Sequence, residues 1–576
     1  MKNMFKRAIA TASLCAFCAS MTTTMATAET EIDYTQYGMG GITLTNEEEE
    51  ALLQEYSSHE TEAVSHSRST TLSSIDLSMS DYFPEIGDQG GVGACCAWAT
   101  TYYQFTYEAN KLNNIVTTAT NTYSPAWTYN LVNRGVDEGS NVPNIYEVLK
   151  RQGALTLEDC PYNGYNYNYA WSTNTEAMIE ALSTRLSTSG AVSISTYNTN
   201  QITSCTDSQL ETVKQYLCAG KPLVINVVAG PGLSNWLTKS TTTGEAAVYR
   251  ASIPAPDASG NIDAHALTVV GYNDGIKCDV NGNGLIEESE KGAFKVANSW
   301  GNDWYNGGYV WVMYDALNLV SANTTNNWES SKSGTRLPAF SSVRSGGGSN
   351  IFFYMNVAHH EVNLVGLLTL TTNYRYNMDL YTARGTTTTY PSAAYQYHGV
   401  GVVGSTEAAP YSGTLVLDYG SLDDDIENYL SGNKWFVRIL NGTGGGNITN
   451  VSYQLVDNKN NLVHNLGSIA TYLIPESDYS RLIALNLQLG DVDYDKTLTA
   501  VDAQMILNFS ASGGVGENTM SDLQCTLADY NQDGVVNSID ASGVYGALSA
   551  SEAAAFEAAL RKNLCKIINC DKNVRQ

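Results

Sequence analysis

The segment from Gln89 to Trp98, Gln-Gly-Gly-Val-Gly-Ala-Cys-Cys-Ala-Trp, constrains this chain more than any other. It places a side-chain amide donor six residues before a cysteine, with glycines between them and a helix-forming run after them. A nucleophilic thiolate needs such surroundings, because a helix N-terminus lowers the pKa of a thiol and a nearby N–H donor stabilises an oxyanion. We therefore expect Cys95 to begin a helix at a reactive site.

A candidate base and its partner follow later in the chain. His265 is the only histidine between the cysteine segment and Asn298, which begins the run Asn-Ser-Trp-Gly. A lone histidine is usually structural, but this one is the only general base that its own domain supplies. Cys95 is preferred to Cys96 as the nucleophile because it stands six residues after Gln89 and precedes the apolar helix face.

The length and net charge of the chain limit its domain count and its possible binding partners. A chain of 576 residues is too long for one core and predicts about three domains. The formal net charge of −27 argues against nucleic acid as a partner, because phosphate binding needs basic patches. Neither Gly-x-Ser-x-Gly nor His-Glu-x-x-His occurs, so a serine hydrolase and a zincin lack support.

The N-terminus has the pattern of a secretory signal. Basic residues precede an apolar run over 8–21, and small residues follow up to Ala28, which predicts a signal peptide at 1–28. The run is short for a membrane span, and no later stretch reaches 18 apolar residues. We expect a secreted, extracellular protein with no membrane span. The polar, acidic residues 29–71 form either a pro-segment or a flexible leader.

Secondary-structure patterns divide the remainder into three parts. Over 72–330, a helical pattern follows Cys95 and strand patterns follow His265, which predicts an α+β domain with two lobes. Short alternating strands over 345–480 follow a Ser/Gly-rich linker and predict a β-sandwich. The sandwich is either an accessory binding module or a structural spacer. Residues 486–565 contain an internal repeat.

The cysteine, histidine and asparagine segments resemble papain-like cysteine peptidases of the C1 family, over residues 76–319. The resemblance implies two lobes around a cleft and a protein or peptide substrate. It also implies that Cys95 attacks as a thiolate, that His265 pairs with it and protonates the leaving amine, and that Asn298 orients the imidazole. Gln89 and the Cys95 backbone N–H would stabilise the oxyanion.

The chain departs from the family pattern at two positions. Cys96 stands where the family commonly has tryptophan, and Val92 stands where it often has a bridged cysteine, so that disulfide is absent. Cys96 either packs as a small apolar side chain or traps Cys95 by oxidation. Trp300 either shields the hydrogen bond between Asn298 and His265 or simply fills the core.

The 33-residue interval between His265 and Asn298 contains an EF-hand pattern. Oxygen ligands stand at positions 1, 3, 5 and 12 of this loop, and glycine stands at position 6. The expected ligands are Asp279, Asn281, Asn283, the Leu285 carbonyl and Glu290. Calcium would stiffen the connection between base and orienter; the alternative is an Asn/Gly-rich hairpin without metal.

A second calcium-loop pattern occurs twice near the C-terminus, at an offset of 38 residues, each copy followed by a helical run. The pair resembles a type I dockerin, as in cellulosomal proteins of anaerobic bacteria. The resemblance implies Ca²⁺ and a cohesin partner on a scaffoldin, hence a cell-surface or cellulosome location. The implied ligands are Asp491, Asp493, Asp495, the Thr497 carbonyl and Asp502 in loop one, and Asp529, Asn531, Asp533, the Val535 carbonyl and Asp540 in loop two. The alternative is a calcium-binding pair with no partner.

The sequence therefore predicts a small α-helical dockerin after a papain-like domain and a β-sandwich. The leading hypothesis is a secreted cysteine endopeptidase tethered to a cellulosome. The main alternative is a non-catalytic, cellulosome-borne binding protein with an inactive peptidase fold. A polysaccharide-degrading enzyme is a third possibility, because paired carboxylates cannot be recognised from sequence alone.

Overall fold

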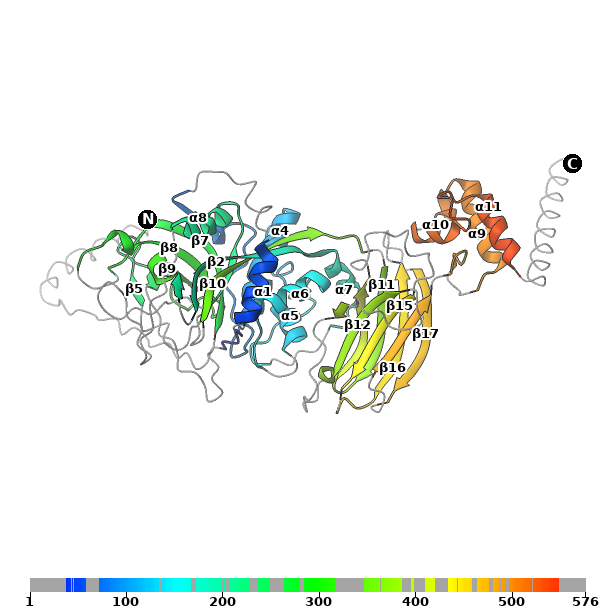
Figure 1. Ribbon diagram of the computed structural model, residues 1–576, viewed down its shortest axis with the longest axis horizontal. Coiled ribbons are helices and arrows are strands. Elements are labelled where there is room, and N and C mark those ends of the chain that lie inside the picture. The colour runs from blue at the N-terminus through cyan, green and yellow to red at the C-terminus, as the bar shows by residue number, and fades with distance from the viewer. Residues whose placement is uncertain are drawn as a thin grey trace, which may run out of the picture. The chain divides into compact units, whose positions relative to one another are not determined.

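The structure is a computed structural model, and Figure 1 shows its helices and strands. It describes residues 38–57, 72–133, 137–166, 172–227, 237–248, 264–317, 347–385, 395–397, 410–419, 434–457, 464–486 and 488–548, apart from short gaps at 43, 45, 199–200, 204–206, 280–283, 363, 443, 476–479, 494–496 and 521. The predicted signal peptide at 1–28 and the last part of the predicted dockerin lie outside the described residues.

A ten-stranded sheet organises the first large region, in the order β3-β2-β10-β4-β7-β8-β9-β6-β5, with β1 also paired to β7. Neighbouring strands are antiparallel except for β6 and β9. The three strands that the sequence predicts after His265 are β7, β8 and β9. The strands are β1 Ser74–Asp76, β2 Thr184–Asn198, β3 Gln201–Thr203, β4 Leu223–Val227, β5 Leu237–Lys239, β6 Ala246–Val248, β7 His265–Lys277, β8 Lys291–Ala297, β9 Tyr309–Met313 and β10 Gly347–His359.

The predicted helix after Cys95 is confirmed, with one irregularity. It begins as α-helix, continues as a π-helix and ends as α-helix at Asn113. Its apolar face is buried, and it contacts β7. π-helical turns are rare in proteins as a whole, and those that occur are often found at functional sites. The helices of this region are α1 Asn46–Ser57, α3 Cys95–Ala97, η3 Trp98–Phe105, α4 Thr106–Asn113, α5 Pro125–Val132, α6 Val142–Gln152, α7 Thr175–Leu182 and α8 Asp207–Cys218.

The structure differs from the sequence prediction at the start of the second region. Residues 347–359, predicted as part of the sandwich, form β10 between β2 and β4 of the ten-stranded sheet. The strand joins this sheet because its inward-facing residues, including Phe352 and Met355, become buried there. The elements that bury them are distant in sequence. The alternating pattern of the strand does not distinguish which sheet it joins.

Two four-stranded antiparallel sheets follow, ordered β14-β11-β16-β17 and β13-β12-β15-β18. Tyr419, just after β14, donates its hydroxyl to the Phe436 carbonyl of β15 at 2.9 Å, so the two sheets share a buried hydrogen bond. The strands are β11 Leu364–Thr372, β12 Met378–Gly385, β13 Tyr395–Tyr397, β14 Tyr411–Asp418, β15 Lys434–Asn441, β16 Ile448–Asp457, β17 His464–Ile474 and β18 Ser480–Asn486.

Two buried polar contacts join this β region to the ten-stranded region. Arg185 at the start of β2 pairs with Asp418 of β14 at 2.5 Å, and both side chains are at most 5% exposed. Arg375 donates to the Asn130 side chain of α5 at 2.7 Å. Removing one partner of a buried ion pair leaves an uncompensated charge, so these contacts restrain the two regions against each other.

The C-terminal region contains α9 Ala500–Ser512, α10 Asp522–Ala528 and α11 Ser538–Ala547. The helices α9 and α11 begin with the same capping box: Thr499 with Asp502, and Asn537 with Asp540. The repeat predicted from sequence is therefore a repeat of local structure, in which the twelfth loop residue also caps the following helix.

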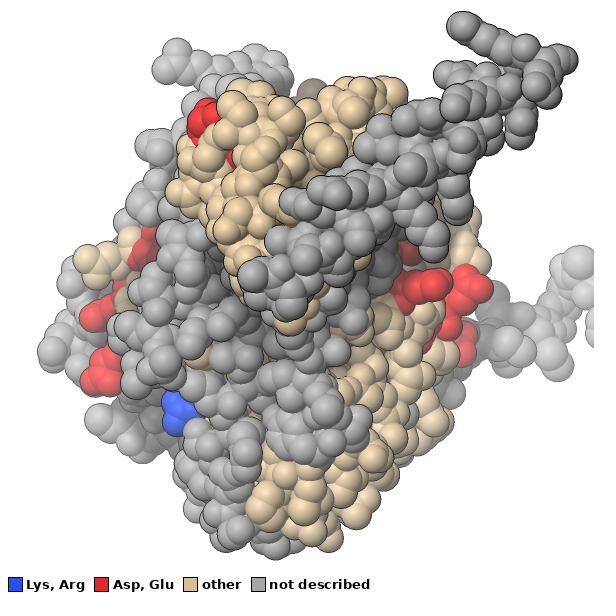
Figure 2. All heavy atoms as spheres, turned by 90° about the vertical axis from the view of Figure 1, so that its right-hand side faces the viewer, with Lys and Arg blue, Asp and Glu red and all other residues tan. Residues whose placement is uncertain are grey.

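Acidic side chains account for most of the charged colour on the face drawn in Figure 2, as expected from the net charge of −27. Within the part of the chain that the structure describes, every helix is too short or too polar to cross a membrane.

Candidate active site

The nucleophile candidate begins the helix that runs from Cys95 to Asn113. Ala94 is the residue that caps this helix, and its carbonyl accepts from Trp98 N–H at 3.0 Å. Cys95 is completely buried. A thiol at the first turn of a helix experiences the partial positive charge of the helix N-terminus, which favours the thiolate.

His265 is the first residue of β7, and Asn298 directly follows β8, the strand beside it. This pairing brings two residues 33 positions apart into contact: His265 Nε2 and Asn298 Oδ1 lie 2.7 Å apart. The Trp300 ring stacks on the imidazole with centroids 4.6 Å apart and is buried, which is compatible with both roles predicted for it, shielding and core packing. Because Nε2 is engaged, Nδ1 is the nitrogen that remains for Cys95.

The electrostatics of the pair favour an ionised nucleophile. Burial by itself would raise the pKa of the Cys95 thiol, but hydrogen bonds from Cys96 and His265 and the charge of His265 lower it to about 5. The hydrogen bond with Cys95 and burial raise the pKa of Cys96 well above its usual value. These opposite shifts favour ionisation of Cys95 and protonation of Cys96, which agrees with the choice of Cys95 as the candidate nucleophile.

Gln89 is buried, and hydrogen bonds hold both its backbone N–H and its side-chain amide. Ser299 donates its hydroxyl to Gln89 Oε1 at 2.5 Å, and Gln89 N–H donates to the Ser299 carbonyl at 2.8 Å. With its oxygen occupied, the amide directs Nε2 to the Val92 and Gly38 carbonyls at 2.9 and 2.7 Å. The orientation of the expected oxyanion donor thus depends on a serine that the sequence analysis does not single out.

Two further contacts tie the helix to its surroundings. Tyr103 donates its hydroxyl to the Asn298 carbonyl at 2.8 Å, so the nucleophile helix also supports the residue that orients the base. The Cys96 thiol donates to the Ser140 carbonyl at 3.2 Å and is completely buried. Cys96 therefore packs in the core, which is one of the two roles predicted for it.

A short segment before the domain crosses this site. We call residues 38–42 the strap. Its Gly38 carbonyl accepts from Gln89, its Gly41 N–H donates to the Ala264 carbonyl at 2.8 Å, and its Ile42 N–H donates to the Ser140 carbonyl at 2.8 Å. Ser140 N–H donates in turn to the Gly40 carbonyl at 2.8 Å. The strap is thus hydrogen-bonded both to Gln89 and to Ala264, the residue before His265.

The strap fits because three of its five residues are glycine. A Cβ atom on Gly40 would lie 1.9 Å from the Gly93 carbonyl oxygen, and one on Gly38 would lie 2.2 Å from the Val92 carbonyl oxygen. Gly40 also has a φ of +85°, which side chains rarely adopt. Backbone therefore packs directly on the loop that leads to Cys95.

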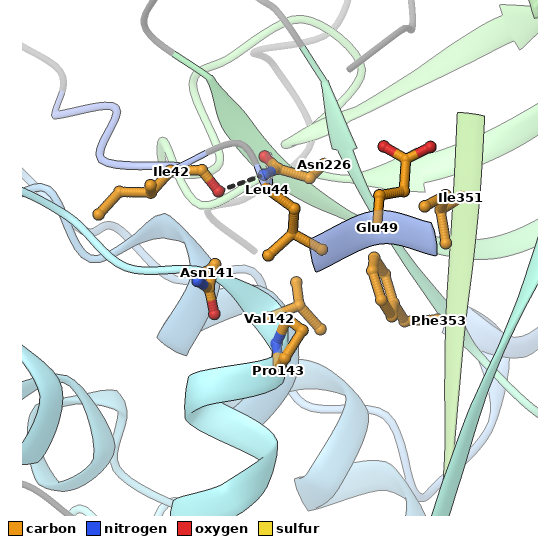
Figure 3. Close-up of a pocket in the computed structure, with 9 residues that line it drawn as sticks. All are labelled: Ile42, Leu44, Glu49, Asn141, Val142, Pro143, Asn226, Ile351 and Phe353. Carbon is orange, nitrogen blue, oxygen red and sulfur yellow. Dashed lines mark hydrogen bonds between the residues drawn. The ribbon is translucent and has the colours of Figure 1, made fainter. Parts of the chain in front are cut away.

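After the strap, the N-terminal segment that leads into α1 lines one side of a pocket (Figure 3). Leu44 points toward Val142 and Pro143 at the start of α6, and α1 passes over Phe353. Asn226 of β4 donates to the Ile42 carbonyl at 3.3 Å. The lining residues are Ile42, Leu44 and Glu49 from the N-terminal segment and Asn141, Val142, Pro143, Asn226, Ile351 and Phe353 from the domain.

The predicted calcium loop lies in the connection between β7 and β8. Asp279 Oδ2 accepts from Gly284 N–H at 2.8 Å, and Glu290 is completely buried with its carboxylate accepting from Glu287 N–H at 2.9 Å. Leu285 is exposed. Asn281 and Asn283 lie outside the described residues, so the structure describes only Asp279, Leu285 and Glu290 of this ligand set.

The C-terminal loops bring their acidic residues together. Carboxylate oxygens of Asp491, Asp493 and Asp502 lie within 4.8 Å of one another, while Asp495 lies outside the described residues. Three converging carboxylates match the hard oxygen ligands that Ca²⁺ prefers. Thr497 is exposed. This exposure is compatible with its predicted role, because only its backbone carbonyl would bind the metal.

The second loop has the same turn. Asp529 accepts from Asp533 N–H at 3.0 Å and Gly534 N–H at 2.7 Å, and Asn531 N–H donates to Asp540 at 3.1 Å. Asp540 is buried, while Val535 is exposed. In both loops, backbone N–H groups therefore donate hydrogen bonds to the predicted carboxylate ligands.

Comparison with known families assigns both regions. Residues 72–327 match the papain family of cysteine proteases, and residues 489–549 match the dockerin type I domain. The chain therefore contains a papain family cysteine peptidase domain and a C-terminal dockerin type I domain. Dockerin type I domains bind calcium, which agrees with the converging Asp491, Asp493 and Asp502.

Among solved structures, the chain is similar to xylellain, a cysteine protease from Xylella fastidiosa, with 16% identity and a TM-score of 0.31 over 56% of this chain and 97% of that chain. It is also similar to digestive procathepsin L 3 of Tenebrio molitor larval midgut, with 12% identity and a TM-score of 0.29 over 56% of this chain and 77% of that chain. The bromelain protease from Ananas comosus in complex with the E64 inhibitor has 15% identity and a TM-score of 0.30 over 50% of this chain and 99% of that chain. No curated protein matches the chain.

Titration of Cys95 tests the electrostatics of the site. Because its pKa is about 5, the ultraviolet absorbance of the thiolate should appear as the pH rises through about 5 and should be absent in Cys95→Ser. In His265→Ala the rise should move to higher pH, because the lowering hydrogen bond and charge are lost while the effect of burial remains. Absorbance that appears only at alkaline pH in the unaltered protein would contradict this assignment.

Proposed function

We propose that this protein is a secreted cysteine endopeptidase that a dockerin tethers to a cohesin of a cellulosome scaffoldin. The observation that carries the peptidase proposal is the 2.7 Å contact between His265 Nε2 and Asn298 Oδ1, with Cys95 on the opposite helix. A buried histidine held by an amide oxygen is oriented for proton transfer to and from a thiol.

The reaction proceeds in two steps. The Cys95 thiolate attacks the scissile carbonyl carbon, and the oxyanion is stabilised by the Cys95 backbone N–H and Gln89 Nε2. His265, as imidazolium, protonates the leaving amine, which yields a thioester. The neutral imidazole then takes a proton from water, whose oxygen attacks the thioester and releases the carboxylic acid and Cys95.

Two other functions are weaker. A non-catalytic binding protein with an inactive peptidase fold would have no need for the Ser299 hydroxyl on Gln89 or for a lowered Cys95 pKa. Local geometry suited to catalysis in three separate segments argues against decay. For a polysaccharide-degrading enzyme, the carboxylates that converge among the described residues, those of Asp491, Asp493 and Asp502, lie in the region that matches the dockerin type I domain.

An epoxide thiol reagent of the E-64 type tests catalysis. It should label Cys95 stoichiometrically, and peptide hydrolysis should fall by roughly three orders of magnitude in Cys95→Ala and in His265→Ala. Gln89→Ala should lower kcat by roughly a hundredfold, the usual effect of losing one oxyanion donor. Folded protein that is neither labelled nor active would favour the binding-protein alternative.

We further propose that residues 29–71 are a pro-segment and that the strap keeps the peptidase inactive. The support is the hydrogen bond from Gln89 to Gly38, because an amide engaged there is not available to a substrate oxyanion. Leu44 and α1 cover the adjoining pocket at the same time. A covalently attached segment competes at high effective concentration, so a short one suffices.

Gly40→Val tests the strap in the full-length chain. The added side chain cannot fit against the Gly93 carbonyl, so the strap should leave and epoxide labelling of Cys95 should be roughly tenfold faster or more. Met39→Val is the matched control, because Met39 already carries a Cβ, and its labelling rate should equal that of the unaltered chain. Equal rates in all three proteins would show that the strap does not limit access.

We also propose that Ca²⁺ occupies the two dockerin loops and the loop between β7 and β8. The three converging carboxylates support the first dockerin loop, and the buried Glu290 and the turn that Gly284 closes on Asp279 support the peptidase loop. Calcium would supply the positive charge that holds these carboxylates together. The exposed Val501 and Ile539, at matching positions of the two loops, are available to a cohesin.

Calcium removal tests both assignments separately. Adding a chelator should abolish binding to immobilised cohesin and lower the melting temperature of the protein. Asp502→Ala should remove the cohesin-binding response, whereas Glu290→Gln should lower the temperature at which peptidase activity is lost without affecting cohesin binding. Identical melting with and without calcium for the double variant Asp502→Ala/Asp540→Ala, in which only the peptidase loop keeps all of its proposed ligands, would exclude metal from that loop.

A further inference from the structure

An acidic side chain outside the catalytic set stands at the edge of the cleft. Asp137 accepts from Gly93 N–H, with its two carboxylate oxygens 2.9 and 3.2 Å from the nitrogen, and from the hydroxyl of Tyr129. Gly93 is two residues before Cys95, so this carboxylate is anchored on the loop that leads to the nucleophile. Neither the sequence motifs nor the proposed reaction uses it.

Among the described residues, no cation pairs with the negative charge of Asp137. Its two partners are neutral donors, and burial and the nearby carboxylate raise the pKa of Tyr129, so that the phenol keeps its proton. Among the ion pairs of the described residues, none involves Asp137. Asp137 is also exposed, and a carboxylate has about four acceptor positions, so lone pairs remain for a ligand.

The strap places a backbone beside Asp137, on the path that we infer for a bound substrate. Gly40 packs on Gly93: a Cβ atom built on Gly93 would lie 3.3 Å from Gly40 Cα and 2.9 Å from Asp137 Oδ1. The carboxylate and the strap backbone thus meet at the same point. A residue that lies there with a long side chain would bring it against Asp137.

The chemistry of the attack decides which substrate residue lies there. The tetrahedral carbon carries the sulfur of Cys95, an oxygen directed to Gln89 and a leaving nitrogen directed to His265. The fourth substituent, the Cα of the residue that supplies the carbonyl, takes the remaining direction, along the Gly93 loop. Its side chain is therefore the one nearest to Asp137.

We propose that Asp137 is a specificity-determining residue that selects substrates with lysine or arginine as the residue supplying the scissile carbonyl. This inference rests on the proposed peptidase function. The charge is exposed and screened by water, so the selection is moderate and decreases with added salt.

The test uses two fluorogenic peptide amides that differ only in arginine or citrulline, its neutral isostere, before the scissile bond. Active sites of the full-length protein are counted with the epoxide reagent, so that only open enzyme enters kcat/KM. The unaltered protein should hydrolyse the arginine substrate roughly fivefold faster than the citrulline substrate. In Asp137→Asn, which keeps an acceptor for Gly93 and Tyr129, the ratio should fall to about one, because the arginine substrate loses its charge contact while the loop keeps its hydrogen bonds.

Glu138→Gln is the matched control, because it removes the same charge from the next residue, and it should leave the ratio unchanged. A ratio near one in the unaltered protein, or a ratio preserved in Asp137→Asn, overturns the proposal. An equal loss in Glu138→Gln also overturns it, because the preference would then come from the general acidic field. If neither substrate is hydrolysed and Cys95 is not labelled, the peptidase proposal itself fails.

Discussion

The site depends on two consecutive residues after β8 that hold opposite sides of the nucleophile. Asn298 binds the imidazole of His265, and Ser299 donates its hydroxyl to the side-chain oxygen of Gln89 and accepts from the Gln89 backbone N–H. One turn of backbone therefore sets the distance between base and oxyanion donor. Both groups are buried, so each must have partners to avoid the cost of an unpaired polar group, and those partners restrict them to one orientation.

The same burial explains the electrostatics. A thiol in an apolar interior resists ionisation, and only the hydrogen bonds of Cys96 and His265, with the charge of His265, reverse that tendency at Cys95. Cys96 replaces the tryptophan that the family commonly has, yet it adds a donor next to the nucleophile and holds the Ser140 carbonyl at 3.2 Å. Ser140 in turn binds the strap, so the nucleophile helix and the substrate side of the cleft are connected through one small side chain.

Much of this could be predicted from residues that are close in sequence. The helix after Cys95, the strands after His265 and the repeated loop-helix unit all have local patterns, and the structure contains them. The capping boxes of Thr499 and Asn537 show why the repeat can be recognised in the sequence. In each copy, the end of the loop is hydrogen-bonded to the first turn of the following helix within four residues. Other features have no local signal. The alternation of β10 does not say which sheet receives it, and the acidic leader gives no sign that Gly38 reaches Gln89.

The sequence by itself determined the chemistry: an amide, a thiol, an imidazole and a second amide in the order of a known peptidase family, and two loops with calcium spacing. Only the tertiary structure decided how these groups are held and what lies between them. Ser299 and Gln89 are 210 residues apart, and Asp137 and Gly93 are 44 residues apart. Contacts at such separations come from the packing of the whole domain, whereas the identity of a reactive atom is present in each residue before the chain folds.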